Sequence, residues 1–271
     1  MAVIETALAD TQQAFDSVAS GYDRSNAANP ILTAMRQRVL AAIVAYTPSA
    51  GQVLDLGCGP GADVETLALR GYRLTAIDWS AAMVEETKAR VARAGLGSRV
   101  DIHHLGIQEL DRMPARRFDT VYSNFGALNC VPSLPDGIRL VADRLVEGGV
   151  FVASVIGRMC PWEMALFAGR GDFARMAVRF SRDLTPVPLN GRTVWTRYYT
   201  PAEFERVTAS FGFARVSLRA LGVFSPPPYM EAFASRHPAL VAGLQRLEDR
   251  SGYWPVVRNL GDHFLLVLKK L

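Results

Sequence analysis

The segment that most constrains the fold is VLDLGCGPGAD, which runs from Val53 to Asp63. An apolar run leads here into three glycines within five positions, Gly57, Gly59 and Gly61. Glycine adopts positive φ at little cost and lets a ligand come close to the backbone. A strand that passes through such a turn into a helix can bind a ligand at the carboxyl end of a parallel sheet. The segment therefore predicts a ligand site between the first strand and the next helix.

Strand and helix patterns alternate from this segment onward. Five short apolar runs predict strands, and two more follow near the end of the chain. This rhythm predicts an α/β fold: a Rossmann-like, doubly wound, mostly parallel seven-stranded sheet with helices on both faces. The expected strands are residues 53–56, 73–78, 99–105, 118–124, 149–156, 215–221 and 263–271, and the expected helices are about residues 30–47, 63–69, 81–95, 137–145 and 201–213.

The alternation of strand and helix patterns is interrupted twice. We expect a single domain over residues 1–271 with an N-terminal extension and two inserted segments. Residues 1 to about 48 form a helical extension, and the two expected insertions are residues 157–200 and 225–261. The first insertion is rich in arginine and aromatic residues, has a helical pattern and contains no clear strand. We expect both insertions to be helical segments that cover a substrate.

The composition argues against several other classes of protein. The net charge of +4 comes from scattered basic residues, and the densest pair is Arg116-Arg117. A nucleic-acid-binding protein more often carries a basic cluster, so we expect no nucleic-acid partner. No stretch reaches the roughly 18 consecutive apolar residues of a membrane-spanning helix, so we expect no membrane span. Three cysteines without a CxxC pair favour a reducing compartment, and we expect a cytoplasmic protein.

The residues around the glycines narrow the choice of ligand. Their spacing, G-x-G-x-G, differs from the dinucleotide fingerprint, and no Gly-Lys-Ser/Thr follows as in a phosphate-binding loop. Asp55 would repel a pyrophosphate but would suit an ammonium or sulfonium group. Asp78 ends the second strand and can accept hydrogen bonds from both hydroxyls of a ribose. A cationic amino acid joined to a ribose describes S-adenosylmethionine.

Four motifs resemble those of class I S-adenosylmethionine-dependent methyltransferases. VLDLGCGPG is similar to the first motif of that family, LTAIDWSAAMVEETK to the second, LGIQEL to the third and FDTVYSNFGALN to the fourth. The segment FDSVASGYDR resembles the N-terminal segment of the ubiquinone and menaquinone type, which acts on small molecules. The resemblance covers residues 15–151 well and the last two strands loosely. It implies an enzyme that moves a methyl group from S-adenosylmethionine, by in-line displacement, to an O, N or C atom of a small-molecule acceptor.

The resemblance also implies which residues hold the cofactor. The three glycines pass under its methionine part, Asp55 lies close by and orients either the loop or the amino group of the cofactor, and Asp78 takes the ribose hydroxyls. Asn124 lies near the methyl group, and Gln108 departs from the family, which often has Asp-Leu or Asp-Ala at the adenine edge. The expected cofactor-binding residues are Tyr22, Asp55, Gly57, Cys58, Gly59, Gly61, Asp78, Trp79, Met83, Gly106, Ile107, Gln108, Asn124 and Phe125.

The acceptor side of the site is less determined by the sequence. Metal-assisted methylation needs a carboxylate cluster after the fourth strand, where Ser123-Asn124 stands instead, so we expect no metal. No residue stands out as a general base, and the candidates are Tyr22, His104, Tyr198, Tyr199 and His237. Aromatic side chains of the first insertion either cover an apolar or aromatic acceptor or only cover the sheet. The candidates for contact with the acceptor are Trp162, Phe167, Trp195 and Tyr199.

Two other functions remain open at this point. The chain could bind S-adenosylmethionine or S-adenosylhomocysteine as a noncatalytic, regulatory protein, in which case no acceptor would gain a methyl group. It could also be a nicotinamide oxidoreductase, which the glycine spacing disfavours. Calorimetry with S-adenosylhomocysteine and NADH separates these two ligand classes.

Overall fold

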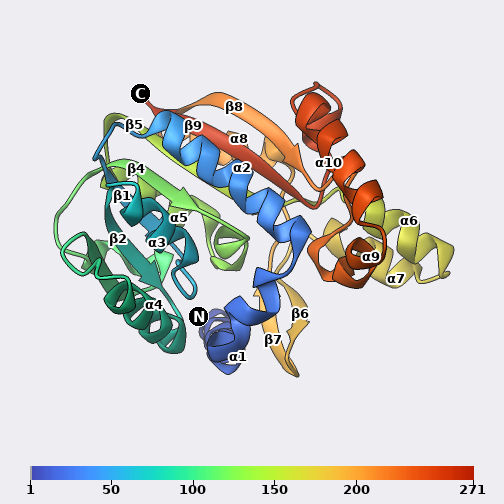
Figure 1. Cartoon of the computed structure of the whole chain (residues 1–271), viewed down its shortest axis with the longest axis horizontal. Coiled ribbons are helices and arrows are strands. Elements are labelled where there is room, and N and C mark those ends of the chain that lie inside the picture. Colours follow the sequence, from blue (N-terminus) through green and yellow to red (C-terminus); the bar gives the residue numbers. More distant parts are fainter. Residues whose placement is uncertain (1) are drawn as a thin grey trace.

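A computed structural model describes residues 2–271, apart from the side chains of Ala2, Val3, Ser25 and Ala27. Met1, the first residue of the expected N-terminal extension, lies outside the described residues. Seven strands form one sheet in the order β3-β2-β1-β4-β5-β9-β8, and β9 runs antiparallel to both of its neighbours (Figure 1). This arrangement confirms the expected mostly parallel, doubly wound fold. The strands are β1 Gln52–Leu56, β2 Arg73–Asp78, β3 Val100–His104, β4 Phe118–Ser123, β5 Leu145–Ile156, β8 Phe213–Leu221 and β9 His263–Lys270.

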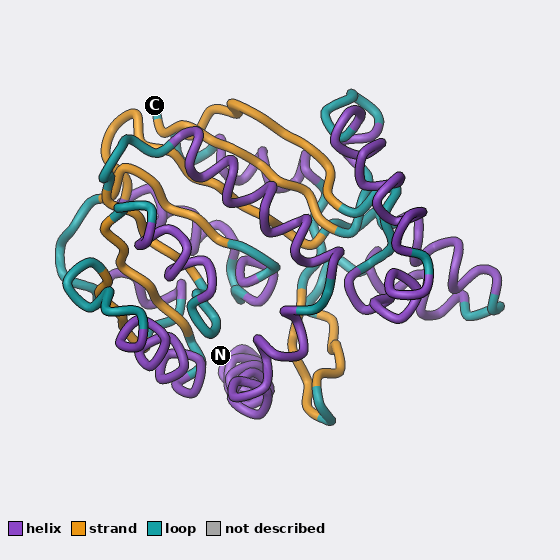
Figure 2. The backbone as a smooth tube through the Cα atoms, in the orientation of Figure 1, coloured by secondary structure: helices purple, strands orange, loops and turns teal. Residues whose placement is uncertain are grey.

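Helices cover both faces of this sheet (Figures 1 and 2). One core cluster joins α2 and α3 to the sheet through Ile31, Met35 and Val64, and a second joins α5 and α8 through Ile138 and Phe204. No described helix combines the length and the apolar character that crossing a bilayer requires. The helices are α1 Ala2–Ala27, α2 Pro30–Tyr46, α3 Ala62–Leu69, α4 Ala81–Arg93, α5 Leu134–Arg144, α6 Pro161–Gly169, α7 Phe173–Ala177, α8 Pro201–Ala209, α9 Glu231–Arg236 and α10 Pro238–Ser251.

The first insertion differs from its predicted helical character. Besides α6 and α7 it contains a hairpin, β6 Thr185–Leu189 and β7 Arg192–Thr196, where the sequence pattern predicts no strand. The turn residues Asn190 and Gly191 have φ values of 50° and 73°. A two-residue hairpin turn needs this pair of left-handed residues, and Asn-Gly is its strongest signal. Two prolines within β6 conceal that signal, because proline usually argues against a strand.

Helix α1 and the hairpin lie side by side at the carboxyl edge of the sheet (Figure 1). The backbone N–H of Trp195 donates to Thr11 Oγ1 at 3.1 Å, and its indole N–H donates to Asp10 Oδ2 at 3.0 Å. On its other side α1 accepts a hydrogen bond from the Trp79 indole at the Leu8 carbonyl, at 3.1 Å. The N-terminal extension and the first insertion therefore form one roof over the strand ends.

Candidate functional site

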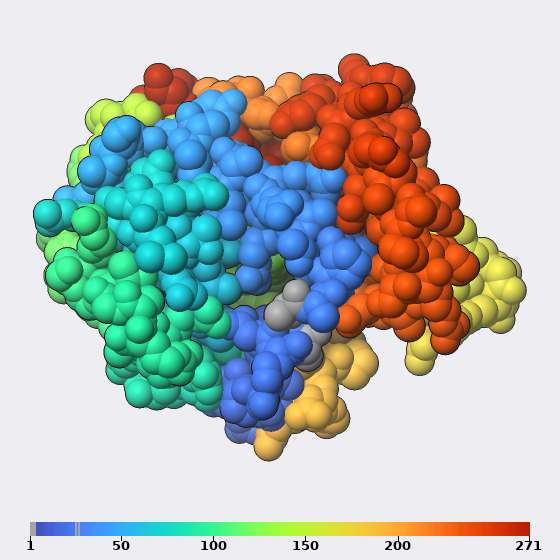
Figure 3. All heavy atoms as spheres, viewed as in Figure 1, coloured from blue at the N-terminus to red at the C-terminus, as the bar shows by residue number. Residues whose placement is uncertain are grey.

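A cavity of about 320 Å³ lies under this roof, beside the carboxyl ends of β1, β2, β3 and β4. Figure 3 shows the surface hollowed between α1 and α2. A larger open groove of about 770 Å³ lies between α2 and α10, but no residue of the four motifs lines it. The smaller cavity is therefore the candidate site. Apart from the predicted residues, its walls are Leu8, Thr11, Gln12, Phe15, Arg36, Pro60, Asp63, Ser80, Leu105, Gly126, Ala127, Cys130, Val131, Ile156, Val187, Pro188, Leu189, Val194 and Thr196.

The predicted cofactor-binding residues gather around this cavity with two exceptions. Asp55 and Gly61 do not line it. The other twelve do: Tyr22, Gly57, Cys58, Gly59, Asp78, Trp79, Met83, Gly106, Ile107, Gln108, Asn124 and Phe125.

The three glycines of the loop all have positive φ, but their surroundings differ. A Cβ atom on Gly57 would lie 2.5 Å from Cβ of Ala127, and one on Gly61 would lie 2.8 Å from Cγ2 of Thr87. Both glycines therefore allow close packing within the protein. A Cβ atom on Gly59 would meet no atom within 4 Å, so this glycine leaves space at the cavity wall.

Asp78 fastens the loop and also faces the cavity. One carboxylate oxygen accepts the N–H of Gly59 and the other accepts the N–H of Ser80, each at 2.8 Å. Burial raises the pKa of Asp78, and these two hydrogen bonds act in the opposite direction. Each oxygen keeps a further lone pair, so the carboxylate can accept two more hydrogen bonds from a ligand.

The sequence predicts Asp55 at the ligand site, but its side chain does not line the cavity. It is buried below the loop, where the Tyr122 hydroxyl donates to its Oδ2 at 2.5 Å. The carboxylate at the cavity is Asp63, which accepts a hydrogen bond from Asn124 Nδ2 at 2.9 Å. Its Oδ1 lies 3.3 Å from Nε of Arg36 and has no hydrogen-bond partner among the described residues. The carboxylate at this wall of the cavity therefore comes from the start of α3 rather than from the end of β1.

We expect the Asp55→Asn variant to flatten the pH dependence of stability. Burial raises the pKa of Asp55 well above its usual value, although the Tyr122 hydrogen bond lowers it. The folded state then binds a proton that the unfolded state releases near pH 4, so stability falls as pH rises from about 4 toward the folded pKa. Asparagine has no such proton and can still accept from Tyr122. Melting temperatures of both proteins from about pH 5 to 9 test this, and equal slopes would contradict it.

The cavity wall beside β3 has an unused hydrogen-bond donor. Gln108 lies at the carboxyl end of β3, in the short 3₁₀ turn Ile107–Arg112. Its Nε2 is buried and has no hydrogen-bond partner in the described part of the chain. A Cβ atom on Gly106 would lie 2.2 Å from that nitrogen, so the glycine makes room for the amide. Buried polar groups are normally paired, and an orphaned one at a cavity wall fits a bound ligand.

Of the predicted general bases, Tyr22 alone lines the cavity. His104 and His237 are exposed and lie outside it. Burial raises the pKa of Tyr22, Tyr198 and Tyr199, so these hydroxyl groups keep their protons. None of the five candidates therefore both lines the cavity and can act as a general base there.

The four residues predicted to contact the acceptor do not line the cavity either. The Trp162 indole donates to the Phe224 carbonyl at 2.8 Å, and Tyr199 packs in the core. Phe167 on α6 is also outside the cavity. Trp195 faces α1 because side chains alternate along a strand, so its neighbours Val194 and Thr196 face the cavity instead. The unpredicted hairpin therefore decides which residues form this wall.

The cysteines at the cavity are not activated nucleophiles. Burial raises the pKa of Cys130 to about 12 and raises that of Cys58 well above its usual value. Both remain thiols at neutral pH, and a thiol is a poor nucleophile. Over residues 2–271, the described side chains contain no group of three His, Cys, Asp or Glu that could hold a metal ion.

Comparison with known proteins supports the interpretation of the cavity. A family model described as a methyltransferase domain matches residues 53–149, which include the glycine loop, Asp78, Gln108 and Asn124. The chain is 25% identical over 173 residues to the ubiquinone biosynthesis O-methyltransferase of Psychrobacter arcticus, covering 63% of this chain and 62% of that protein.

Residues 53–149 match the methyltransferase domain, and the chain has the fold of solved S-adenosylmethionine-dependent methyltransferases.

A second relative and a solved structure that are similar to this chain are also methyltransferases. The trans-aconitate 2-methyltransferase of Paracidovorax citrulli is 44% identical over 162 residues, which cover 53% of this chain and 58% of that protein. The chain thus spans about three fifths of the length of these curated relatives. The Burkholderia thailandensis 1,6-didemethyltoxoflavin-N1-methyltransferase, solved with its acceptor and S-adenosylhomocysteine, has the same fold. It superposes with a TM-score of 0.58 at 17% identity and covers 97% of this chain and 88% of that one.

Proposed function

We propose that the chain transfers a methyl group from S-adenosylmethionine to a small-molecule acceptor by direct in-line displacement, without a metal ion. The observation that carries this proposal is the cavity, where a bare backbone position, a strand-end carboxylate and an unpaired amide lie together. The residues fit the cofactor: Asp78 suits a ribose, Gln108 an adenine edge and Gly59 a closely approaching chain. The cofactor supplies a methyl group on a positively charged sulfur, which needs no further activation.

The methionine end of the proposed site has both charges that an amino acid requires. Arg36 on α2 lines the cavity, stacks over the Phe125 ring at 5.4 Å and pairs with Asp63. Its guanidinium would hold the carboxylate of the methionine part, while Asp63 would accept from the ammonium group. Catalysis by this chain then consists mainly of alignment and exclusion of water, to which α1 and the hairpin contribute as a roof.

We expect the Arg36→Met variant to bind S-adenosylhomocysteine roughly tenfold to a hundredfold more weakly, because hydrogen bonds to charged groups contribute roughly 1.5–3 kcal/mol. Adenosine, which lacks the methionine part, serves as the control ligand and should bind both proteins equally. Calorimetric titration of both ligands measures the effect, with Arg36→Lys as an intermediate case. An equal loss for both ligands would show that Arg36 acts through the fold rather than through the carboxylate.

We further propose that the acceptor is an apolar or aromatic small molecule rather than a nucleic acid. Support comes from the wall beyond Phe125, which is formed by Val131, Ile156, Val187 and Leu189. The cavity is roofed by α1 and the hairpin and is too small for a polymer duplex. Three free thiols are consistent with action in the cytoplasm.

The deciding experiment is incubation of the protein with methyl-labelled S-adenosylmethionine and metabolite extracts, followed by mass spectrometry. We expect label in a low-molecular-weight compound and equimolar S-adenosylhomocysteine. Binding of S-adenosylhomocysteine without label transfer to any fraction would show a noncatalytic binding protein. Binding of NADH instead would overturn the cofactor assignment itself.

A further inference from the structure

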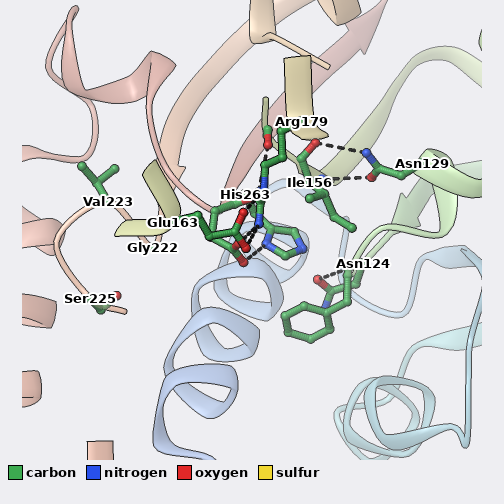
Figure 4. Close-up of polar contacts among 12 residues, drawn as sticks. Asn124, Asn129, Ile156, Glu163, Arg179, Gly222, Val223, Ser225 and His263 are labelled. Atoms are coloured by element: carbon green, nitrogen blue, oxygen red, sulfur yellow. Dashed lines mark hydrogen bonds and ion pairs between the residues drawn. The ribbon is translucent and has the colours of Figure 1, made fainter. Parts of the chain in front are cut away.

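A buried charge network lies behind the cavity wall, where the first insertion meets the start of β9 (Figure 4). Arg179 follows α7 and donates to both carboxylate oxygens of Glu163, at 2.5 and 2.8 Å. It also donates to Oδ1 of Asp262 at 2.6 Å and to the carbonyls of Gly157 and Asp262 at 2.9 and 3.1 Å. All three guanidinium nitrogens are therefore engaged inside the protein. Arg179 therefore positions Asp262 and has no nitrogen left to bind a ligand.

Asp262 in turn determines the tautomer of the neighbouring histidine, His263. Its Oδ2 lies 2.8 Å from Nδ1 of His263. Burial acts to raise the pKa of Asp262, but the neighbouring Arg179 and His263 side chains outweigh it and hold the pKa well below the usual value. An ionised carboxylate only accepts hydrogen bonds, so Nδ1 of His263 carries a proton, and in the neutral tautomer this leaves an unshared electron pair on Nε2. Nε2 is buried and has no hydrogen-bond partner among the described residues.

His263 lies one side chain away from the cavity. It is the direct partner of Ile156 in the antiparallel pairing of β5 and β9, which places both side chains on the same face. Its ring also packs edge-on against Phe125, with the ring centroids 6.0 Å apart. Ile156 and Phe125 both line the cavity, and Figure 4 shows the His263 ring between Arg179 and Asn124. The orphaned nitrogen is therefore separated from the methyl end of the site by one layer.

Phe125, which lines the cavity, packs directly against the His263 ring. Its φ is 51°, in the left-handed region that a bulky residue seldom adopts. Such strain is commonly kept at functional positions, where a small change of conformation relieves it. An acceptor in the cavity would reach His263 by displacing the Phe125 ring.

We propose that His263 is the proton acceptor for methyl transfer, with Asp262 and Arg179 as positioning residues, and that the acceptor attacks through an O–H or N–H group. This inference rests on the proposed function. The proton of the acceptor passes to Nε2 as its oxygen or nitrogen forms the bond to the methyl carbon. The methyl–sulfur bond breaks and its electron pair stays on sulfur. The products are the methylated acceptor, S-adenosylhomocysteine and an imidazolium ion, which Asp262 stabilises until the proton leaves to water.

The tautomer of His263 can be measured in the absence of any acceptor. The chain has four histidines, so protein with ¹⁵N-labelled histidine gives a simple NMR spectrum. The signals of His263 are identified as those missing from the His263→Gln variant. At alkaline pH, where the rings are neutral, we expect His263 to carry its proton on Nδ1, and we expect Asp262→Asn to remove that preference. A proton on Nε2 of the wild-type ring would overturn the proposal, because that nitrogen would have no electron pair to offer.

The reaction itself is tested with labelled S-adenosylmethionine and the metabolite extract as probe. His263→Gln should lower label transfer by roughly 10²–10⁴-fold, the range for general base catalysis, while calorimetry shows unchanged affinity for S-adenosylhomocysteine. The matched control is His103→Gln, because His103 forms a His–Asp pair with Asp101 at 3.1 Å on β3, outside the cavity. Equal rates for wild type and His263→Gln would overturn the role of His263 alone. A wild type that transfers no label would overturn the proposed function as well.

Discussion

The Asp78→Ala variant should bind S-adenosylhomocysteine at least about a hundredfold more weakly than the wild type. Its carboxylate faces the cavity and has two lone pairs left for ribose hydroxyls. Hydrogen bonds to a charged group contribute roughly 1.5–3 kcal/mol each, and about 1.4 kcal/mol corresponds to a factor of ten. Because Asp78 also holds Gly59 and Ser80, removal of the carboxylate loosens the loop and adds to the loss. Calorimetric titration with S-adenosylhomocysteine measures the effect.

Two comparisons separate ribose recognition from loop support in this variant. Adenosine should lose affinity in parallel, because it contains the same ribose, in contrast to the behaviour expected for Arg36→Met. Asp78→Asn should lose less, since its amide oxygen still accepts one hydrogen bond. A lowered melting temperature with unchanged affinity for both ligands would show that Asp78 only supports the loop and the start of α4.

Most of the residues that gather around the cavity could be predicted from the sequence because their pattern is local. Backbone that must approach a ligand requires glycine, and a parallel strand places its last side chain at the ligand edge, as for Asp78. Asp55 lies outside the cavity, because one position within a strand decides whether a side chain points to the site or into the core. Asp55 turned inward to Tyr122, and the helix start supplied Asp63 instead.

The place of Arg36 at the cavity and the wall formed by the hairpin could not be predicted because they depend on tertiary packing. Arg36 reaches the cavity from a helix that begins more than twenty residues before the glycine loop, and no local pattern marks it. The hairpin had a readable signal in Asn190-Gly191, and recognition of it would have directed Trp195 away from the cavity. His263 acquires its partners only when the first insertion brings Arg179 to Asp262, 83 positions further along the chain.

The Gly59→Val variant should lose measurable binding of S-adenosylhomocysteine while it keeps its fold. Gly59 has φ of 54° and lines the cavity, and a Cβ atom there would meet no protein atom within 4 Å. The new side chain therefore does not collide with the protein; it occupies the space into which we place the cofactor. The left-handed backbone adds strain of roughly 1–3 kcal/mol, which lowers stability whether or not a ligand binds here.

Gly95→Val is the matched control for that strain. Gly95 follows α4 outside the cavity, has φ of 68° and likewise has no atom within 4 Å of its Cβ position. Both variants should therefore melt at similarly reduced temperatures, and Gly95→Val should bind S-adenosylhomocysteine as the wild type does. If both variants lose affinity equally, strain explains the loss and Gly59 has no special relation to the ligand. Wild-type affinity in Gly59→Val would show that the cofactor does not approach the loop, because valine cannot share that space with it.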